Sequence, residues 1–408
     1  MRSTSLLVSS LVSSSSLVAE MDFGSWSTKF GKSYGAEERA TRAAIFASNA
    51  QVVSQLSAAS PGAVFSLDTP FADLTEEEFA KAALMPPRAA PRLAPERRLP
   101  ALNASAAPSS FDWRNHNAVS SVKDQGALGS CWAFSAIGNI EGQLAIKSGA
   151  APVSLSVEQL LECDNSSHPT NSSGEPVGGD CGEFGGWPYL AFGYFERAGG
   201  VLTDADMPYC AGIPLGKPGS CEPCMAAGYD KKTCGNHGRR LQGLQSKDDD
   251  LYDDDGQVPL YCNKSTTKGQ GPLDYCGAGA AKAGFAAHVA DWKAIGTDEE
   301  QIAAALAGGG SADGAAAFGG GPLSILLNAG PLQFYKKGVF SPGGLFKCDP
   351  KKLDHGVLLV GYGTDAGKDY WTVKNSWGAT WGESGYFRLE RGVGACGVNA
   401  QVVTALLA

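Results

Sequence analysis

The stretch that decides the fold runs from Gln125 to Ser135, with the sequence Gln-Gly-Ala-Leu-Gly-Ser-Cys-Trp-Ala-Phe-Ser. A turn containing glycine precedes Cys131, and the apolar spacing from Cys131 to Ile146 predicts a buried helix that begins at the cysteine. The first turn of a helix presents unpaired backbone N–H groups and the positive end of the dipole, which favour a thiolate over a thiol. Cys131 is therefore a candidate nucleophile, although a lone cysteine more often packs as a small apolar side chain. The Gln125 side-chain amide and the Cys131 backbone N–H predict an oxyanion hole beside it.

A histidine and an asparagine further along the chain supply the groups that such a nucleophile needs. His355 begins the apolar run of residues 355–363, which predicts a core strand. Asn375 lies in the segment Lys-Asn-Ser-Trp-Gly of residues 374–378. We expect Asn375 to accept a hydrogen bond from the imidazole of His355 and so to fix its tautomer, beneath Trp377.

The composition restricts the class of protein. The chain has 408 residues, of which 43% are hydrophobic and 18% are charged, so it is long enough to bury a large core in one or two domains. Its formal net charge of -9 argues against a nucleic-acid partner, because phosphate binding needs a concentrated basic surface. No segment approaches the roughly 20 continuous apolar residues that span a bilayer, so we expect no membrane span.

Cysteine content and glycosylation triplets point to the secretory pathway. The 11 cysteines are many for a cytosolic protein, and their odd number leaves at least one thiol over if the others pair. Triplets of the form Asn-X-Ser/Thr lie at Asn103, Asn165, Asn171 and Asn263. Residues 1–19 resemble a weak signal peptide, in which serines dilute the apolar stretch. A lysosome-like or vacuole-like compartment, or the extracellular space, is the expected location.

The remaining chain divides into three parts. Residues 20–84 carry apolar residues at helical spacing, and Thr75 with Glu78 forms a capping box. Residues 85–107 are rich in Pro, Ala and Arg, which predicts an extended, exposed and easily cut linker. Residues 108–408 predict a globular domain, interrupted at about residues 210–276 by a polar, cysteine-rich insertion whose dense run of aspartates favours the surface.

The residues around Cys131 and Asn375 resemble the active-site motifs of papain-family cysteine proteases. The segment 125–135 is similar to the cysteine motif, and the segment 375–382 is similar to the asparagine motif. The resemblance covers most of the chain and extends to the cathepsin L and cathepsin F types. It implies an α+β fold in which a helical left domain packs on a β-barrel-like right domain, with the active site between them.

The resemblance also implies a role for each site residue. Cys131 would attack a peptide carbonyl, His355 would carry the proton to the leaving amine, Asn375 would orient His355, and Gln125 would help to bind the oxyanion. The backbone of an extended substrate would pair with Gly185 and Gly186. Further residues implied in substrate binding, most of them around the S2 pocket, are Trp187, Pro188, Leu326, Leu353, Gly356, Trp377 and, at the pocket floor, Gln401. Such a pocket favours an apolar P2 residue.

The N-terminal segment resembles the inhibitory propeptide of the same subgroup. Five residues match its interrupted helix motif, namely Glu38, Arg42, Phe46, Asn49 and Val53, whereas Ser57 replaces the usual asparagine. In a second motif Phe71 and Asp73 match, whereas Leu67 and Thr69 do not. The resemblance implies a zymogen in which residues 20–84 inhibit the enzyme and assist its folding.

The cysteines follow the family only in part. The resemblance implies disulfides between Cys348 and Cys396 and between Cys163 and Cys276, with Cys221 as the alternative partner of Cys163. Leu128 replaces a cysteine that is usual in the family, so Cys181 loses its ordinary partner. The partners left open are those of Cys181, Cys210, Cys221, Cys224, Cys234 and Cys262. Part of this set, with His237, has spacing that also suits zinc, but an oxidising compartment favours disulfides, so we expect no metal and no cofactor.

The expected function is that of a monomeric cysteine endopeptidase that cleaves proteins or peptides and is inhibited by its own propeptide. A carboxypeptidase is one alternative, because the insertion lies where cathepsin B carries its occluding loop. The acidic run and the single His237 would serve poorly to capture a substrate carboxylate. A catalytically silent binding module of the same fold is the other alternative, but Gln125, Cys131, His355 and Asn375 are all present.

Overall fold

The computed structural model describes residues 21–164, 180, 182, 185–209, 284–309, 319–343 and 348–408. The expected signal peptide over 1–19 and the insertion at about 210–276, with its cysteines and His237, lie outside the described residues. Within the described ranges, no helix has the length and apolar character needed to cross a membrane.

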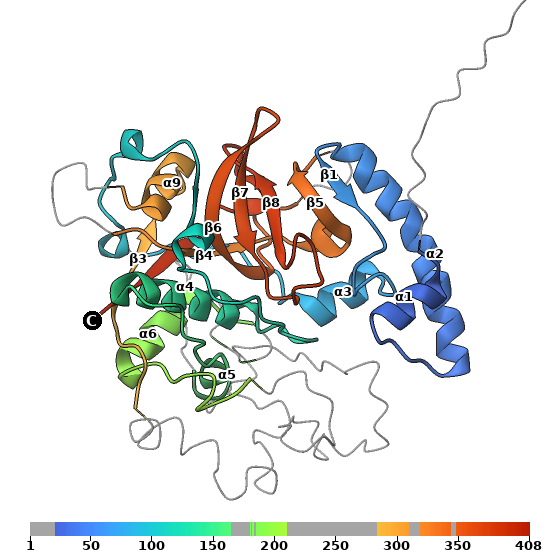
Figure 1. The fold of residues 1–408 in the computed structure, drawn as a ribbon, viewed down its shortest axis with the longest axis horizontal. Helices are drawn as coiled ribbons and strands as arrows, with labels where there is room; N and C mark the ends of the chain where they lie inside the picture. Colours follow the sequence, from blue (N-terminus) through green and yellow to red (C-terminus); the bar gives the residue numbers. More distant parts are fainter. Residues whose placement is uncertain are drawn as a thin grey trace, which may run out of the picture.

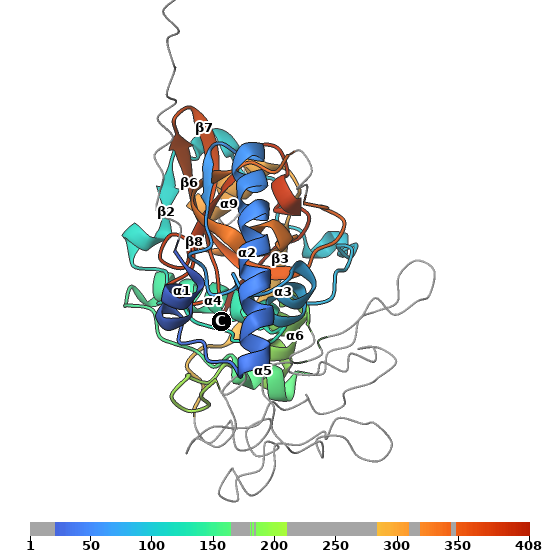
Figure 2. The same cartoon turned by 90° about the vertical axis from the view of Figure 1, so that its right-hand side faces the viewer.

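The N-terminal segment folds into helices beside the sheet, on the right of Figure 1. Its elements are α1 (Phe23–Lys29), α2 (Ala36–Ala59), β1 (Ala63–Phe65) and α3 (Glu76–Ala83). Asp22 caps α1 by accepting two backbone N–H groups, and Thr75 and Glu78 form the predicted capping box at the start of α3. Figure 2 shows α2 lying lengthwise across this side of the molecule. The residues that α2 buries are Phe46, Asn49, Val53 and Leu56.

The central helix of the structure is α4 (Cys131–Ser148). It is buried without interruption from Cys131 to Gly142, which explains why its sequence is apolar on every side. It ends at Gly149, whose φ of 67° is a left-handed conformation that glycine adopts without strain. Two further helices, α5 (Glu158–Cys163) and α6 (Pro188–Ala198), lie with α4 in the lower left of Figure 1.

An open sheet packs against α4 and carries the other half of the core. Its strands are β2 (Phe111–Asp112), β3 (Val289–Ile295), β4 (Leu323–Leu327), β5 (Tyr335–Phe340), β6 (His355–Asp365), β7 (Lys368–Lys374), β8 (Tyr386–Glu390) and β9 (Val402–Leu407). The strand order is β1-β5-β8-β7-β6-β4-β9-β3, with β2 paired to β6, and only β5 and β8 are parallel. The mixed helix and sheet content agrees with the predicted α+β class. The described strands do not close into a barrel, because β1 and β3 end an open path.

The other regular elements are short. They are α9 (Glu299–Ala307) and the 3-10 helices η1 (Pro95–Arg97), η2 (Ala104–Ala106), η3 (Trp113–His116), η7 (Gly330–Phe334) and η8 (Ala395–Gly397). Asp298 caps α9 by accepting the backbone N–H of Glu300. Of these elements, α9, η7 and η8 contribute buried residues to the core.

The segment 85–107 is less exposed than its composition predicts. Met85 and Leu102 are buried, and Arg88 forms an antiparallel bridge with Leu353. Arg98 forms a further bridge, with Ala294 of β3. Pairing with the backbone of the globular domain therefore orders a segment whose own sequence has no regular period.

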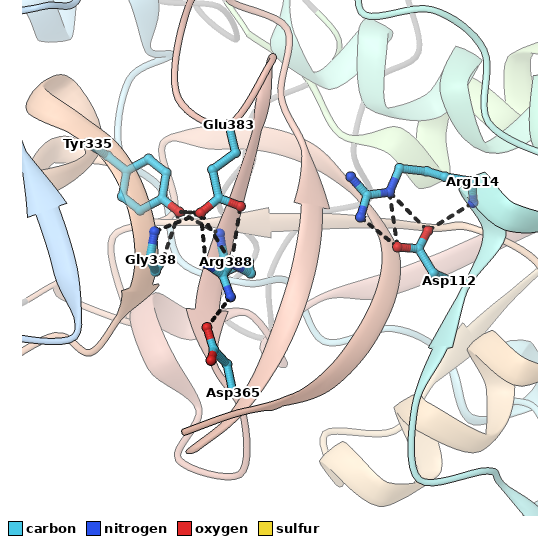
Figure 3. A network of polar contacts seen from close by, with 7 residues as sticks. All are labelled: Asp112, Arg114, Tyr335, Gly338, Asp365, Glu383 and Arg388. Carbon is cyan, nitrogen blue, oxygen red and sulfur yellow. Dashed lines mark hydrogen bonds and ion pairs between the residues drawn. The ribbon is translucent and has the colours of Figure 1, made fainter. Parts of the chain in front are cut away.

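A polar network fixes β5, the strand that β1 joins (Figure 3). One oxygen of Glu383 accepts the backbone N–H of Gly338 at 2.6 Å, and the same carboxylate accepts hydrogen bonds from the Arg388 guanidinium. Arg388 also donates to Asp365 at 2.6 Å, and Tyr335 Oη donates to the Gly338 carbonyl at 2.7 Å. The edge that receives the N-terminal segment is thus held in place by residues of the globular domain.

Candidate active site

Cys131 is the first residue of α4 and is buried. The Ser130 side chain makes no capping hydrogen bond, and its hydroxyl lies 3.0 Å from that of Tyr209. The first-turn N–H groups of α4 are therefore not taken up by this side chain. A thiol at this position experiences the positive end of the helix, which stabilises the thiolate.

His355 begins β6, and its ring is oriented from two sides. Its Nε2 lies 2.7 Å from Asn375 Oδ1, and its ring stacks on Trp377 with 4.6 Å between the ring centres. Asn375 Oδ1 also accepts the backbone N–H of Ser376 at 2.8 Å, which fixes the amide orientation. An amide oxygen can only accept, so Nε2 carries the proton and Nδ1 presents a lone pair.

The acid–base state of His355 follows from its burial. Burial lowers the pKa of His355 to about 4, although the hydrogen bond to Asn375 acts in the opposite direction. Nδ1 is buried and has no hydrogen-bond partner among the described residues. The imidazole is therefore neutral at neutral pH, with a lone pair ready to accept a proton.

Gln125 lies close to the first turn of α4, and its side chain is fully buried. Its Oε1 accepts a hydrogen bond of 2.6 Å from Ser376 Oγ, next to Asn375. Its Nε2 donates to the Leu128 carbonyl at 2.6 Å and to the Ala83 carbonyl at 3.1 Å. Ser376, which the sequence did not single out, thus links Gln125 to the asparagine segment.

A buried charged cluster lies behind Asn375. Glu141 of α4 accepts from Lys123 at 2.8 Å and from the Leu155 backbone N–H at 2.8 Å. Lys374 donates to Ser120 at 2.9 Å, and burial lowers its pKa to about 8. A cavity of about 20 Å³ lies between these groups and Asn375. The cluster connects α4 to the end of β7 and so supports the position of Asn375.

Residues 71–88, which precede the globular domain and are called the covering segment below, lie over this site. The rings of Phe71 and Phe79 each pack edge-on against Trp377, with 5.3 Å between ring centres. The Met85 N–H donates to the Asp354 carbonyl at 2.8 Å, directly before His355. Water and substrate are therefore kept from the histidine while the segment is in place.

The residues predicted for substrate binding are all buried. Trp187, Leu326 and Leu353 are buried in one apolar cluster with Cys131 and Met85. Gly185, Gly186, Pro188 and Gly356 are also buried. An added Cβ on Gly356 would meet the α4 backbone at Trp132, so only glycine fits there. The residue predicted at the pocket floor, Gln401, is buried with neither amide atom hydrogen bonded to any described residue.

Three polar residues near the site belong to no recognisable sequence motif. Burial raises the pKa of Asp354 to about 7, while Asn328 and the Ala329 N–H, which donate to its carboxylate, act in the opposite direction. The other two are Arg88, whose guanidinium carbon lies 5.4 Å from the Trp187 ring centre, and Asp180, whose Oδ1 accepts the Trp187 backbone N–H at 2.6 Å. Adjacency to His355 was a signal for Asp354, whereas Arg88 and Asp180 are placed by tertiary contacts alone.

The cysteines agree with the family pattern as far as they are described. Cys348 and Cys396 form a disulfide, as the resemblance implies. Cys163 is also disulfide-bonded, to a cysteine outside the described residues, so its predicted partner Cys276 stays a prediction. In the described ranges no group of three or more His, Cys, Asp or Glu side chains is arranged to hold a metal ion.

Comparison with known proteins identifies the family to which this chain is similar. The family described as "Papain family cysteine protease" matches residues 107–406, and the "Cathepsin propeptide inhibitor domain" matches residues 23–79. Cysteine proteinase 15A of Pisum sativum is 33% identical over 401 residues, which cover 96% of this chain and 88% of that protein. Cathepsin F of Mus musculus is 31% identical over 391 residues, which cover 94% of this chain and 64% of that protein.

Solved structures of enzyme precursors share the fold. Digestive procathepsin L2 proteinase from Tenebrio molitor larval midgut superimposes with a TM-score of 0.63 at 26% identity, over 94% of this chain and 98% of that one. The recombinant stem bromelain precursor gives a TM-score of 0.62 at 26% identity, over 94% and 97%. The chain therefore belongs to the papain family of cysteine proteases and carries the propeptide inhibitor domain of its cathepsin members.

Proposed function

We propose that this protease is an endopeptidase in which Cys131 and His355 form the catalytic pair. His355 Nδ1 takes the thiol proton of Cys131, and the sulfur attacks the scissile carbonyl carbon, so that a carbon–sulfur bond forms as the carbonyl oxygen becomes an oxyanion. The Gln125 amide and the Cys131 backbone N–H stabilise that oxyanion. The carbon–nitrogen bond breaks as the oxyanion collapses, and His355 Nδ1 gives the proton that it took from sulfur to the leaving amine. Water then loses a proton to Nδ1 as it attacks the thioester, the carbon–sulfur bond breaks, and the same proton returns to sulfur as the acid leaves.

The observation that carries this proposal is the hydrogen bond of 2.7 Å between His355 Nε2 and Asn375 Oδ1. It holds the proton on Nε2 and leaves Nδ1 as the atom that exchanges a proton with sulfur. Stacking on Trp377 keeps the ring in this orientation. Asn375 and Trp377 are positioning residues in this mechanism.

We further propose that residues 20–84 are the inhibitory prosegment, that residues 85–107 contain the activation cleavage, and that residues 108–408 form the mature enzyme. Acid would weaken the prosegment. Burial raises the pKa of Glu78, but the ion pair with Arg42 and the hydrogen bond from the Thr75 N–H outweigh burial and lower it. The ionised Glu78 therefore stabilises the prosegment at neutral pH, and this stabilisation is lost as the pH falls through that pKa. Because Glu78 is partly exposed, solvent screening reduces this contribution.

The substrate would carry an apolar P2 residue. Met85 of the covering segment is buried in the same apolar cluster as Trp187, Leu326 and Leu353, the residues predicted to line S2. These apolar surroundings would suit an unbranched apolar side chain of a substrate. A monomer that acts on proteins in a lysosome-like compartment or outside the cell fits the propeptide and the disulfide.

The test is to replace the proposed nucleophile in the full chain. After processing in trans, Cys131→Ala is expected to lose peptidase activity by about 10⁴-fold or more, because the attacking sulfur is gone while little volume is lost. Circular dichroism and the unfolding midpoint should match the parent, which separates lost chemistry from lost folding. Turnover by this variant within tenfold of the parent would contradict the proposal.

A further inference from the structure

The linker of residues 85–107 has a stretch in its middle that makes no polar contact with the rest of the protein. Residues 89–93, which we call the free interval, form no hydrogen bond and no ion pair with any described residue. Arg92 is exposed, and its neighbours Pro91 and Leu93 are only partly buried. Local opening of the free interval breaks no hydrogen bond, so it is readily reached by a protease.

The part of the linker that follows is fixed to the globular domain by polar contacts. Arg97 forms an ion pair with Asp291 of β3, and its guanidinium carbon lies 4.8 Å from the ring centre of Trp292. Leu102 is only 5% exposed, and its backbone N–H and carbonyl exchange hydrogen bonds of 2.8 and 3.1 Å with the side-chain amide of Gln301 on α9. We call residues 97–107 the docked segment.

The docked segment also covers one edge of the sheet. Arg98 forms a parallel β-bridge with Ala294, and the Leu99 N–H donates to the Ala294 carbonyl at 2.9 Å. On its other side Ala294 pairs with Val403 of β9, because β3 is the last strand in the order of the described sheet. An edge strand without such a cover presents unpaired backbone groups that can associate with other chains.

We propose that the activating cut falls in the free interval, between residues 89 and 94, and that the docked segment stays on the enzyme as the cover of the β3 edge. The proposal rests on the protease function proposed above and narrows the activation site given there. Hydrolysis of one peptide bond consumes one water and leaves a carboxylate on the prosegment and a new amine on the enzyme. The first active product then carries the docked segment ahead of the domain of residues 108–408. A cut after Arg92 would place Pro91, an apolar residue, at P2.

Trypsin is a direct probe of this difference, because the linker carries four arginines that it cleaves by the same chemistry. Arg92 lies in the free interval, Arg88 is paired at the cleft, and Arg97 and Arg98 lie in the docked segment. The full-length Cys131→Ala chain is incubated with dilute trypsin, and the new N-termini are quantified by mass spectrometry. Cleavage follows the population of the locally opened chain, so cutting after Arg92 should exceed cutting after each of the other three by about tenfold or more. Equal rates would overturn the inference.

Gln301→Ala tests the docking itself. It removes both hydrogen bonds to Leu102 and should raise cutting after Arg98 about tenfold, while cutting after Arg92 stays the same. Glu300→Gln is the matched control on the same helix, because its carboxylate is 66% exposed and pairs with Arg391, which lies outside the linker. It should change neither rate. Unchanged cutting after Arg98 in Gln301→Ala would overturn the role given to the docked segment.

The parent chain supplies an independent measurement. Its first product on incubation in acid, followed over time by N-terminal sequencing, should begin between residues 90 and 94. A first product that begins at residue 95 or later would overturn the inference. A parent chain that neither processes itself nor cleaves peptides would instead overturn the proposed function, and the trypsin pattern would still decide where the linker opens.

Discussion

The side-chain amide of Gln125 donates a hydrogen bond of 3.1 Å to the main-chain carbonyl oxygen of Ala83. Ala83 is the last residue of α3, in the propeptide, and Gln125 lies just before the catalytic helix. A propeptide carbonyl thus occupies the donor to which we assign the substrate oxyanion. In the proposed mechanism the inhibitory segment therefore blocks the oxyanion site in addition to the surface around it.

Replacing Gln125 by alanine should slow the activated enzyme by about 10²-fold to 10³-fold in kcat, because one oxyanion donor is lost. KM should change much less, since the contact strengthens in the transition state. Steady-state kinetics on a P2-leucine peptide, normalised by active-site titration, measures both values. Ser376→Ala removes only the hydroxyl that donates to Gln125 Oε1, so its loss should be smaller. An equal loss in the two variants would contradict a direct role for the amide.

The pKa of His355 should rise when the prosegment leaves. Burial lowers it to about 4 in the zymogen, whereas a solvated histidine titrates near 6.5. Between these two values the chain with its prosegment in place therefore binds fewer protons than the chain after release. Release of the prosegment takes up a proton, so it becomes more favourable as the pH falls from about 6.5 to 4. The full difference is about 3 kcal/mol for this one group.

The measurement is histidine NMR on Cys131→Ala, which cannot process itself, before and after cleavage in trans by the parent enzyme. Among the other histidines, exposed His116 serves as an internal reference. The same titration midpoint for His355 in both forms would refute the linkage.

Gly338→Ala should weaken latency more than catalysis. Gly338 has a φ of 92°, and an added Cβ would collide with the carbonyl oxygen of Gly62, at the turn into β1. The propeptide strand should therefore dock poorly, and the uncut chain should show activity at neutral pH that the parent lacks. Activity of the precursor and of the processed enzyme is measured side by side.

Gly343→Ala is the matched control, because its Cβ would meet open space. It should keep the precursor inactive. Full latency in Gly338→Ala would show that pairing between β1 and β5 contributes little to inhibition.

Gln401→Met should stabilise the processed enzyme. Neither amide atom of Gln401 has a hydrogen-bond partner among the described residues, and an unsatisfied buried polar group costs about 1 to 3 kcal/mol. Methionine has nearly the same shape and removes that cost. Urea unfolding of the processed Cys131→Ala background reports the difference in unfolding free energy.

Gln159→Met provides the opposite control. Gln159 is buried with both amide ends satisfied, by the Gly200 carbonyl and by the Leu202 N–H. This variant should be destabilised, since two backbone groups lose their partners. A destabilised Gln401→Met would mean that the amide is satisfied in solution.

The helix behind Cys131 and the strand behind His355 were predictable because their signals are local. The apolar run behind Cys131 specifies a helix that begins at the cysteine, and the run behind His355 specifies a strand. Residue type and spacing then indicate where Gln125 and Asn375 belong. These signals do not depend on how distant segments meet.

The linker of residues 85–107 was predicted less well, because its order comes from contacts with residues that are distant in the sequence. Its Pro, Ala and Arg content indicates an exposed linker, yet Met85 is buried and Arg88 pairs with Leu353. Asp180 accepts the backbone N–H of Trp187, a contact that no local sequence pattern indicates. The open path of the sheet was also not evident, because strand patterns specify faces and not closure.

The bridge between Cys348 and Cys396 encloses β6, β7 and β8 in a covalent ring. His355 and Asn375 lie inside the ring, and Cys131 lies outside it. The molecule thus needs opposite chemistry at two places, a reduced sulfur at the head of α4 and an oxidised pair around the strands that carry its base. A thiol that keeps the first sulfur reduced also acts as a reductant of the second, but slowly, because the bridge cysteines are only 9% and 3% exposed. The choice of reductant therefore affects both sites, since opening the ring would loosen His355 while Cys131 stayed intact.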